Sequence, residues 1–495
     1  MQFADYQFNP TGNFKLLGAP FGSAIFCAEH TRKRAQKAVL LLQKVAALAD
    51  TQTALHLTRQ CASYCKLAYS MRVVPPVLHG EVLQAFSADI RTALEELLQA
   101  DAGDRGWAQA KLAIRRGGLG IRGAEDHASA AYIASLQSTM RLCGCIDSAF
   151  DTTDTSGHLY QDASLADYAS SVLPDAAAAA RQSQKRMSAM IDAKLEQDLR
   201  NASQGDGIYC AHLSLQQLHG AGAWLTAPPA DAARSIDPAL FTVALKRRLR
   251  VRVQDADTFC PLCGCTMDSY GDHALVCPCG GDRTIRHNRL LHSVHEDAVR
   301  GNMSPEKEKA GLLPERPCED GMADACATGQ GPPGQRSRRR PADLFIPRAL
   351  GGKPTALDFA CTSGLRTDRL QLAGSCPETI LTDYEEFKRS FQPVGDAATT
   401  AELCKHAGLV FTPMVIEAHS GGWGRVARQT LDAIAKRAGA CWRGEAEVES
   451  LRIAQRLSCS LHKETARAIL RRLQDPVILD DVGCWSPSEM ATDWQ

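Results

Sequence analysis

The spacing of three cysteines and one histidine constrains this chain more than any other feature of its sequence. Cys260 and Cys263 form one close pair, Cys260-x2-Cys263, and His273 and Cys277 form a second, His273-x3-Cys277. Tight turns in "CPLCG" and "GDHALVC" would let the two pairs converge on one ion. Because thiolate and imidazole ligands at such spacings are typical of tetrahedral zinc, we predict a zinc site with these four ligands.

Two further cysteines leave the choice of ligands open. Cys265 and Cys279 lie close enough in the sequence to take the places of Cys263 and Cys277. The alternative to a metal site is a group of ordinary free thiols with a surface histidine. Since four protein ligands leave no open coordination position, we expect the zinc to be structural and not hydrolytic.

The overall composition is that of an ordinary globular protein. The 495 residues are 44% hydrophobic and 23% charged, which allows roughly two to four domains. The 56 basic and 56 acidic residues balance, so a basic surface for nucleic acid must be local. Nineteen cysteines are too dilute for a disulfide scaffold and no apolar signal segment follows Met1, which favours a reducing, intracellular compartment. The longest apolar run, Ala176 to Ala180, is much shorter than the roughly 20 residues of a membrane helix, so we expect a soluble protein with no membrane partner.

The first third of the chain has the pattern of amphipathic helices. Apolar residues recur at intervals of three and four between Ala35 and Ala49, which predicts one helix. A second helix is expected from Thr53 to Arg72, ended by Pro75 and Pro76. A third would carry on one face Val82, Phe86, Ile90, Ala93 and Leu97.

After residue 340 the pattern changes to short apolar stretches with turn residues around them, which is typical of strands. Helical patterns lie between and after these stretches, and the alternation indicates a mixed α/β sheet domain. We predict strands within Ala342 to Pro347, Thr355 to Thr362 and Leu409 to Ala418, and helices at Thr382 to Ser390, Trp423 to Arg437 and Glu445 to Leu473.

Two basic stretches supply local positive charge. The first precedes the cysteines, and the second ends a Pro/Gly-rich segment that begins at Gly329. Closely spaced cations can follow a phosphate backbone, whereas the alternative is a solvated helix face. Because the first stretch adjoins the predicted zinc site, we favour nucleic-acid binding. The residues are Lys246, Arg247, Arg248 and Arg250, followed by Arg252, and then Arg338, Arg339 and Arg340.

Carboxylates in the predicted sheet domain suggest a second metal site. Asp343 opens one apolar strand, and Asp358 lies inside another, where a charge is costly unless it is paired or binds a metal. Such carboxylates could hold a divalent cation for phosphodiester cleavage. Lys388, on the following helix, could stabilise the charge that develops on the phosphate, and Glu417 at the end of the third strand is a further metal-ligand candidate. The alternatives are a capping Asp343, a salt-bridged Asp358, an ordinary helical lysine and a structural Glu417.

Together these features resemble the C-terminal half of a non-LTR retrotransposon polyprotein of the class that carries a restriction-like PD-(D/E)xK endonuclease. The stretch "FKLLGAPFGS" from Phe14 to Ser23 is similar to the join of palm and thumb in the family's reverse transcriptase. The four predicted zinc ligands match its CCHC knuckle, and the motif that follows the knuckle is represented by Arg286, His287 and Asn288. In "RPAD", Asp343 would be the first acid of the nuclease, and Asp358 the second.

The sequence departs from the family in two places. Ala342 separates Pro341 from Asp343, and Ala360 stands where the usual lysine would fall, so the resemblance assigns that role to Lys388, with Tyr384 one turn before it. The fingers and palm of the polymerase are missing before Leu17, and "FADY" at Phe3 to Tyr6 has a single aspartate. We therefore expect no reverse transcription.

The resemblance implies a multidomain protein with an α-helical N-terminal region, a small CCHC zinc knuckle and an α/β restriction-endonuclease-like domain. Its expected activity is Mg²⁺- or Mn²⁺-dependent cleavage of DNA, with DNA and element RNA as partners and a nuclear location. The alternatives are a nucleic-acid-binding remnant without turnover and a truncated gene product. The implied regions are a thumb-like region at 14–125, a partly flexible helical linker at 126–243, a basic helix with the knuckle at 244–282, the nuclease at 283–440 and a helical tail at 441–495.

Overall fold

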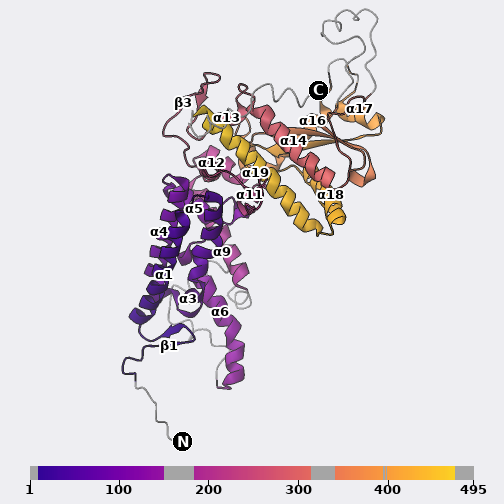
Figure 1. The fold of residues 1–495 in the computed structure, drawn as a ribbon. Helices are drawn as coiled ribbons and strands as arrows, with labels where there is room; N and C mark the ends of the chain where they lie inside the picture. Colours follow the sequence, from indigo (N-terminus) through magenta and orange to yellow (C-terminus); the bar gives the residue numbers. More distant parts are fainter. Residues whose placement is uncertain (1–8, 150–182, 314–340, 394–395, 397, 474–495) are drawn as a thin grey trace, which may run out of the picture. The chain divides into compact units, whose positions relative to one another are not determined.

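The computed structural model describes residues 9–149, 183–313, 341–393, 396 and 398–473. The chain divides into two compact units, one ending at Gln204 and the other beginning at Gly205 (Figure 1). Helices predominate in the described residues, and the sheets are small. A multidomain architecture of helices with small sheets, as expected from the sequence, is therefore what the structure has.

The first unit is built around two long helices, α1 (Ala24–Ala46) and α4 (Pro76–Leu98), which pack against each other. The Ser23 side chain accepts the backbone N–H of Phe26 and begins α1, as expected of a serine N-cap. The first and third predicted helices are therefore confirmed. The buried residues that α1 and α4 share with the predicted faces are Ala35, Ala38, Leu42 and Val45, and Val82, Phe86, Ile90, Ala93 and Leu97.

The second predicted helix is interrupted. The break falls at Ser63, whose φ of −104° and ψ of −132° are not helical. Asp50 accepts the N–H groups of Gln52 and Thr53, which starts the segment earlier than expected. Burial of this segment against its neighbours overrides its helical periodicity. In place of one helix the chain forms α2 (Thr51–Leu57), a π-helical turn (Thr58–Ala62), a 3-10 turn (Tyr64–Lys66) and α3 (Ala68–Val73).

The division between the two units falls inside the segment expected as a linker. Two helices of that segment, α6 (Ala124–Ile146) and α9 (Gln184–Ala202), share a hydrophobic cluster in the first unit, in which Ile133 and Met187 are buried. The other elements of the first unit are β1 (Phe14–Leu16), β2 (Ala19–Phe21), α5 (Gly103–Lys111) and a 3-10 turn (Ile114–Arg116).

The second unit contains a four-stranded sheet in the order β5 (Glu306–Lys307), β6 (Leu344–Ile346), β7 (Thr355–Thr362) and β8 (Val410–Glu417). The β5–β6 and β6–β7 pairs are antiparallel, whereas β7 and β8 are parallel. The three predicted strands are confirmed. The strand β5 was not predicted, because two exposed charged residues give no strand pattern.

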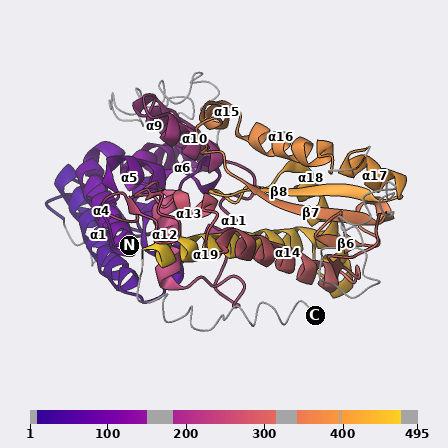
Figure 2. The ribbon, with the colours of Figure 1, turned by 90° about the horizontal axis from the view of Figure 1, so that it is seen from above.

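Alternate residues of β7 face two different layers of helices, as the pleat of a strand requires. Leu357 and Phe359 belong to one core, and Ala360 belongs to the other, together with Val415 of β8. Asp358 lies between Leu357 and Phe359 and so points to the side of Ala360. Figure 2 shows α14 and α19 on one side of β7 and β8, and α16 on the other. The first core includes α14 (Asp282–Arg300), α18 (Arg425–Trp442) and α19 (Ala446–Arg472), and the second α10 (Gly207–Leu215), α15 (Leu370–Ser375) and α16 (Pro377–Ser390).

The helix α19 is an integral part of the second unit, although the sequence suggested a tail. Its residues Ile453, Leu457 and Leu461 lie in the first of these two cores. None of the described helices combines the length and the apolar character that crossing a bilayer requires. The remaining elements of this unit are α11 (Ala223–Thr226), α12 (Pro238–Arg248), β3 (Thr258–Phe259), β4 (Thr266–Met267), α13 (His273–Val276), a 3-10 turn (Leu350–Gly352) and α17 (Thr400–His406).

Candidate functional site

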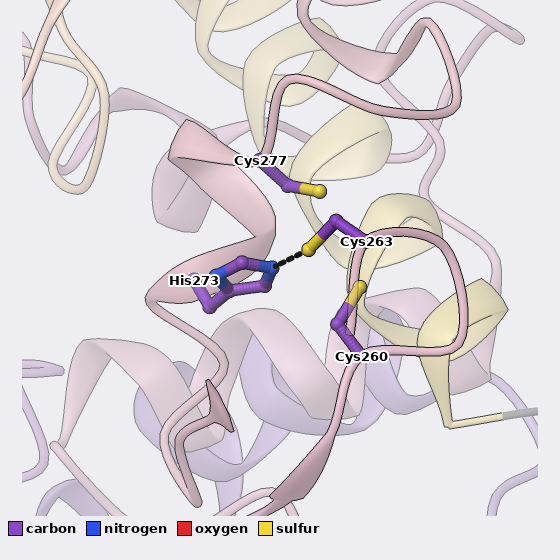
Figure 3. A group of neighbouring side chains, drawn as sticks. All are labelled: Cys260, Cys263, His273 and Cys277. Atoms are coloured by element: carbon purple, nitrogen blue, oxygen red, sulfur yellow. Dashed lines mark hydrogen bonds between the residues drawn. The ribbon is translucent and has the colours of Figure 1, made fainter. Parts of the chain in front are cut away.

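The side chains of Cys260, Cys263, His273 and Cys277 come together, as predicted. One ligand atom from each lies within 4.8 Å of those of the others, and Cys263 Sγ is 3.2 Å from His273 Nε2 (Figure 3). This Cys/His cluster could hold a metal ion, and its donor set is compatible with zinc. Cys265 and Cys279, the alternative ligands, lie outside the cluster.

A short hairpin places the first two cysteines. The strands β3 and β4 pair around the turn "CPLCGC", in which Cys260 N–H donates to Cys265 O at 2.8 Å and Gly264 N–H donates to Cys260 O at 2.9 Å. Gly264 has a φ of +72°, a conformation in which glycine is favoured. The turn therefore brings both thiols to the same side of the hairpin, as Figure 3 shows.

Asp268 and α13 place the other two ligands. Asp268 Oδ2 accepts the backbone N–H of His273 at 2.8 Å, and its Oδ1 accepts that of Asp272 at 3.0 Å. The backbone N–H of Cys277 donates to His273 O at 2.9 Å. One helical turn therefore sets the separation of His273 and Cys277, which explains their spacing in the sequence.

The C-terminal end of α19 supports the Cys/His cluster. Arg472 donates to Asp282 Oδ2 at 2.6 Å and to Cys279 O at 3.1 Å, and Arg471 also pairs with Asp282. A Cβ atom at Gly271 would lie 2.9 Å from the side chain of Ile469. This close approach requires glycine, so α19 packs directly against the loop that leads to His273.

Three arginines of the first basic stretch are structural, which corrects the prediction that they form an exposed surface for nucleic acid. Arg248 is 2% exposed and donates to the backbone oxygens of Gln216 and Ala221 and to Gln216 Oε1. Arg247 and Arg250 both pair with Asp272, at 3.2 and 2.6 Å. Guanidinium groups that are bound to partners within the protein in this way are not available to contact a phosphate backbone.

The rest of the predicted nucleic-acid-binding residues have different outcomes. Lys246 is half-buried on α12, and its predicted role stays a prediction. Arg338, Arg339 and Arg340 lie outside the described residues.

The two predicted metal-binding aspartates, Asp343 and Asp358, line one cleft of about 190 Å³ in the second unit. In the antiparallel pair, Leu344 lies opposite Leu357, and continuing this register by one residue brings Asp343 level with Asp358. Asp343 Oδ2 accepts the backbone N–H of Phe359 at 2.7 Å, which ties it to the strand that carries Asp358.

A third carboxylate, Glu308, also lines this cleft, and sequence reasoning missed it. Glu308 follows β5, and its backbone N–H donates to Asp343 O at 2.9 Å. It lies in "SPEKEKAG", where mixed charges are typical of an exposed segment. Only the pairing of β5 with β6 identifies it as a neighbour of the cleft.

Lys388 reaches Asp358 from α16, and so lies at the site to which it was predicted to belong. Its Nζ lies 2.9 Å from Asp358 Oδ2. Burial raises the pKa of the Asp358 carboxyl, and Asp343 acts in the same direction, whereas Lys388 and His287 lower it. A cation bound beside Asp358 would lower this pKa, because an opposite charge favours the ionised carboxylate. Tyr384 packs against the hydrophobic core on this side of the sheet and contacts the Phe387 ring.

The three residues of the "RHN" motif lie in the first turns of α14 but have different surroundings. Arg286 is buried and donates to Leu275 O of α13 at 3.0 Å, so its predicted contact with nucleic acid is wrong. His287 Nε2 lies 3.4 Å from Asp343 Oδ2 and thus belongs to the carboxylate site. Asn288 is half-buried, and its predicted contact with nucleic acid stays a prediction.

Glu417 is not part of the carboxylate site, which corrects its prediction as a catalytic or metal-binding residue. It lies opposite Thr362 in the parallel pair, four residues along β7 from Asp358. It is fully buried and accepts the backbone N–H groups of Gly364, His419 and Ser420. Its carboxylate therefore holds together the segments that follow β7 and β8. This is the structural role given above as the alternative for Glu417.

Comparison of the chain with protein-family models and with curated proteins gives no match.

Proposed function

We propose that the second unit is a restriction-like DNA endonuclease domain of the kind found in non-LTR retrotransposons, with a catalytic site formed by Asp343, Asp358 and Lys388. The observation that carries this proposal is the 2.9 Å pair of Lys388 and Asp358 beside a cleft shared with Asp343. Two acids and a lysine at one cleft are the groups that metal-dependent phosphodiester hydrolysis needs.

The carboxylates fit a hard divalent cation, Mg²⁺ or Mn²⁺. Asp343, Asp358 and Glu308 present oxygen donors to one cleft, and oxygen ligands are those that such ions prefer. When bound, the ion would polarise the scissile phosphate and lower the pKa of a water nucleophile. Asp343 and Asp358 would hold it, and Lys388 would place its ammonium group where negative charge develops on the phosphate.

The Cys/His cluster would hold zinc in a structural role. Its four side chains would supply all four ligands of a tetrahedral zinc ion and leave no position for a substrate. Zinc would fix the loop between the β3–β4 hairpin and α13, from which α14 leads to the carboxylate cleft. The proposed partner is DNA in the nucleus, with element RNA as a further partner.

Nicking of a supercoiled plasmid tests the proposal. The full-length protein should convert supercoiled to open-circular DNA in the presence of Mg²⁺ or Mn²⁺, and Asp358→Ala should not. Asp368→Ala is a matched control, because Asp368 is exposed and its ion pairs are with Arg366 and Arg369. Absent nicking by the wild type, or equal nicking by wild type and Asp358→Ala, would rule out the proposed activity. DNA binding without nicking would instead favour a binding remnant.

A further inference from the structure

His287 lies beside the first carboxylate of the proposed nuclease site, although it comes from a different element. Its Nε2 is 3.4 Å from Asp343 Oδ2. Its ring meets that of Phe359 edge to face, with 6.3 Å between the centroids. The side chains of His287 and Asp343 are 29% and 26% exposed. The imidazole therefore contacts both the strand β7 and the carboxylate of Asp343, which lines the cleft.

Both contacts of the Asp343 carboxylate use the same oxygen atom. Oδ2 accepts the Phe359 N–H and faces His287 Nε2, and within the described part of the chain no hydrogen bond reaches Oδ1. A neutral imidazole with its proton on Nε2 would donate to Oδ2. With that second donor beside the Phe359 N–H, the rotation of the carboxylate would be fixed and Oδ1 would be left to a cation.

From this arrangement we infer that His287 is a positioning residue that orients Asp343 for the divalent cation, an inference that rests on the proposed nuclease function. Hydrogen-bond partners of metal ligands set the orientation of those ligands, and their loss typically lowers metal affinity or activity roughly 10- to 100-fold.

His287 can serve in this way because the first turns of α14 are fixed to the Cys/His cluster. Arg286 donates to Leu275 O, between the ligands His273 and Cys277. At the start of the helix, Asp282 pairs with Arg471 and Arg472 of α19. The position of His287 is therefore determined by the metal-binding loop on one side, and it contacts the nuclease carboxylate on the other.

A direct ligand role for His287 fits less well. Its Nε2 faces Oδ2, the Asp343 oxygen that also accepts the Phe359 N–H, whereas the cation is assigned to the other oxygen. The imidazole thus supports one carboxylate.

Binding of Mn²⁺ to the zinc-loaded full-length protein tests this role without relying on catalysis. Free Mn²⁺ can be measured by electron paramagnetic resonance. We expect His287→Ala to weaken Mn²⁺ binding roughly 10- to 100-fold and His287→Gln, whose amide can also donate, to recover most of the affinity. His292→Ala is the matched control, because His292 lies on the same helix and contacts Glu296 and Lys307. It should bind Mn²⁺ as the wild type does.

The possible results separate this inference from the proposed function. Wild-type Mn²⁺ affinity in a folded, zinc-loaded His287→Ala protein would overturn the positioning role and leave the nuclease proposal intact. No Mn²⁺ binding by the wild type, or equal binding by Asp358→Ala, would overturn both. If His287→Ala does not fold, His287→Leu, which has no donor, takes its place: a roughly 10-fold or larger loss that His287→Gln does not show supports the role, and wild-type affinity overturns it.

Discussion

Lys388 Nζ lies 2.9 Å from Asp358 Oδ2, although Lys388 belongs to α16 and Asp358 to the strand β7. The pair forms because Asp358 points to the side of the sheet that α16 covers. The position two residues after Asp358 on the same strand is occupied by Ala360, whose side chain packs in the hydrophobic core. A lysine there would be buried among apolar residues, whereas Lys388 reaches Asp358 from the helix.

Replacing Lys388 by alanine should abolish most plasmid nicking and leave DNA binding and folding intact. Removal of a group that stabilises transition-state charge typically lowers kcat by about 10²- to 10³-fold. The measurement is the single-turnover nicking rate at saturating Mn²⁺. Arg389→Ala serves as the control, because Arg389 pairs with Glu386 at 3.8 Å and not with either aspartate. A Lys388→Ala protein that nicks at the wild-type rate would exclude Lys388 from the chemistry.

The site could be predicted from the sequence where its chemistry depends on local spacing or on an unusual residue in a strand. The four members of the Cys/His cluster lie in two short segments, so their proximity could be predicted from their spacing alone. Asp358 was identified because a charge inside an apolar strand needs a partner. By contrast, Glu308 reaches the cleft only through the pairing of β5 with β6. His287 approaches Asp343 only through the packing of α14.

The secondary structure could be predicted where a long periodic pattern marks an element. The prediction failed where tertiary packing determines the backbone conformation. The buried faces of α1 and α4 follow from their spacing, and β7 has the bounds that its apolar run indicated. The break at Ser63 has no glycine or proline to mark it. Likewise, a cluster of arginines gives the same sequence pattern whether it faces solvent or, like Arg248, forms hydrogen bonds inside the protein.

Replacing Cys263 by serine should remove the bound zinc and loosen the region around α13, α14 and α19. Zinc sites of this kind stabilise the fold to which they bind, because the ligands converge only in the folded state. Zinc content per chain and the thermal unfolding midpoint are the measurements. The control is Cys265→Ser, two residues away, exposed and outside the cluster, and it should keep both. Zinc loss in Cys265→Ser with retention in Cys263→Ser would reassign the ligand.

Replacing Arg248 by alanine should destabilise the protein instead of specifically weakening its affinity for DNA. Arg248 is 2% exposed, and its removal leaves the oxygens of Gln216 and Ala221 without their donor. A buried polar group that loses its partner costs about 1–3 kcal/mol. The comparison is urea unfolding of Arg248→Ala and Arg252→Ala, because Arg252 is exposed and its alanine variant should change stability by less than about 0.5 kcal/mol. Equal stability of the two variants would contradict the structural role.

His79 should make the first unit less stable in mild acid. It lies on α4, is 1% exposed, and its Nδ1 is 3.0 Å from Thr31 Oγ1 of α1. Burial lowers the pKa of His79 from 6.5 to about 4, so the unfolded chain binds the proton more tightly than the folded one. The stability that the neutral side chain provides is complete above pH 6.5 and is lost as the pH falls from 6.5 towards 4, by at most about 1.4 kcal/mol per pH unit for one proton.

Urea unfolding of the full-length chain between pH 8 and pH 4.5, followed by circular dichroism, measures this contribution in wild type and in His79→Asn. Asparagine does not titrate, so the variant should lose less stability than the wild type between pH 6.5 and pH 4.5. Its free energy of unfolding should differ from that of the wild type by a constant amount above pH 7.5, which serves as the control. Parallel curves for the two proteins throughout would show that His79 does not contribute, because a buried neutral histidine must give up this free energy when the unfolded state is protonated.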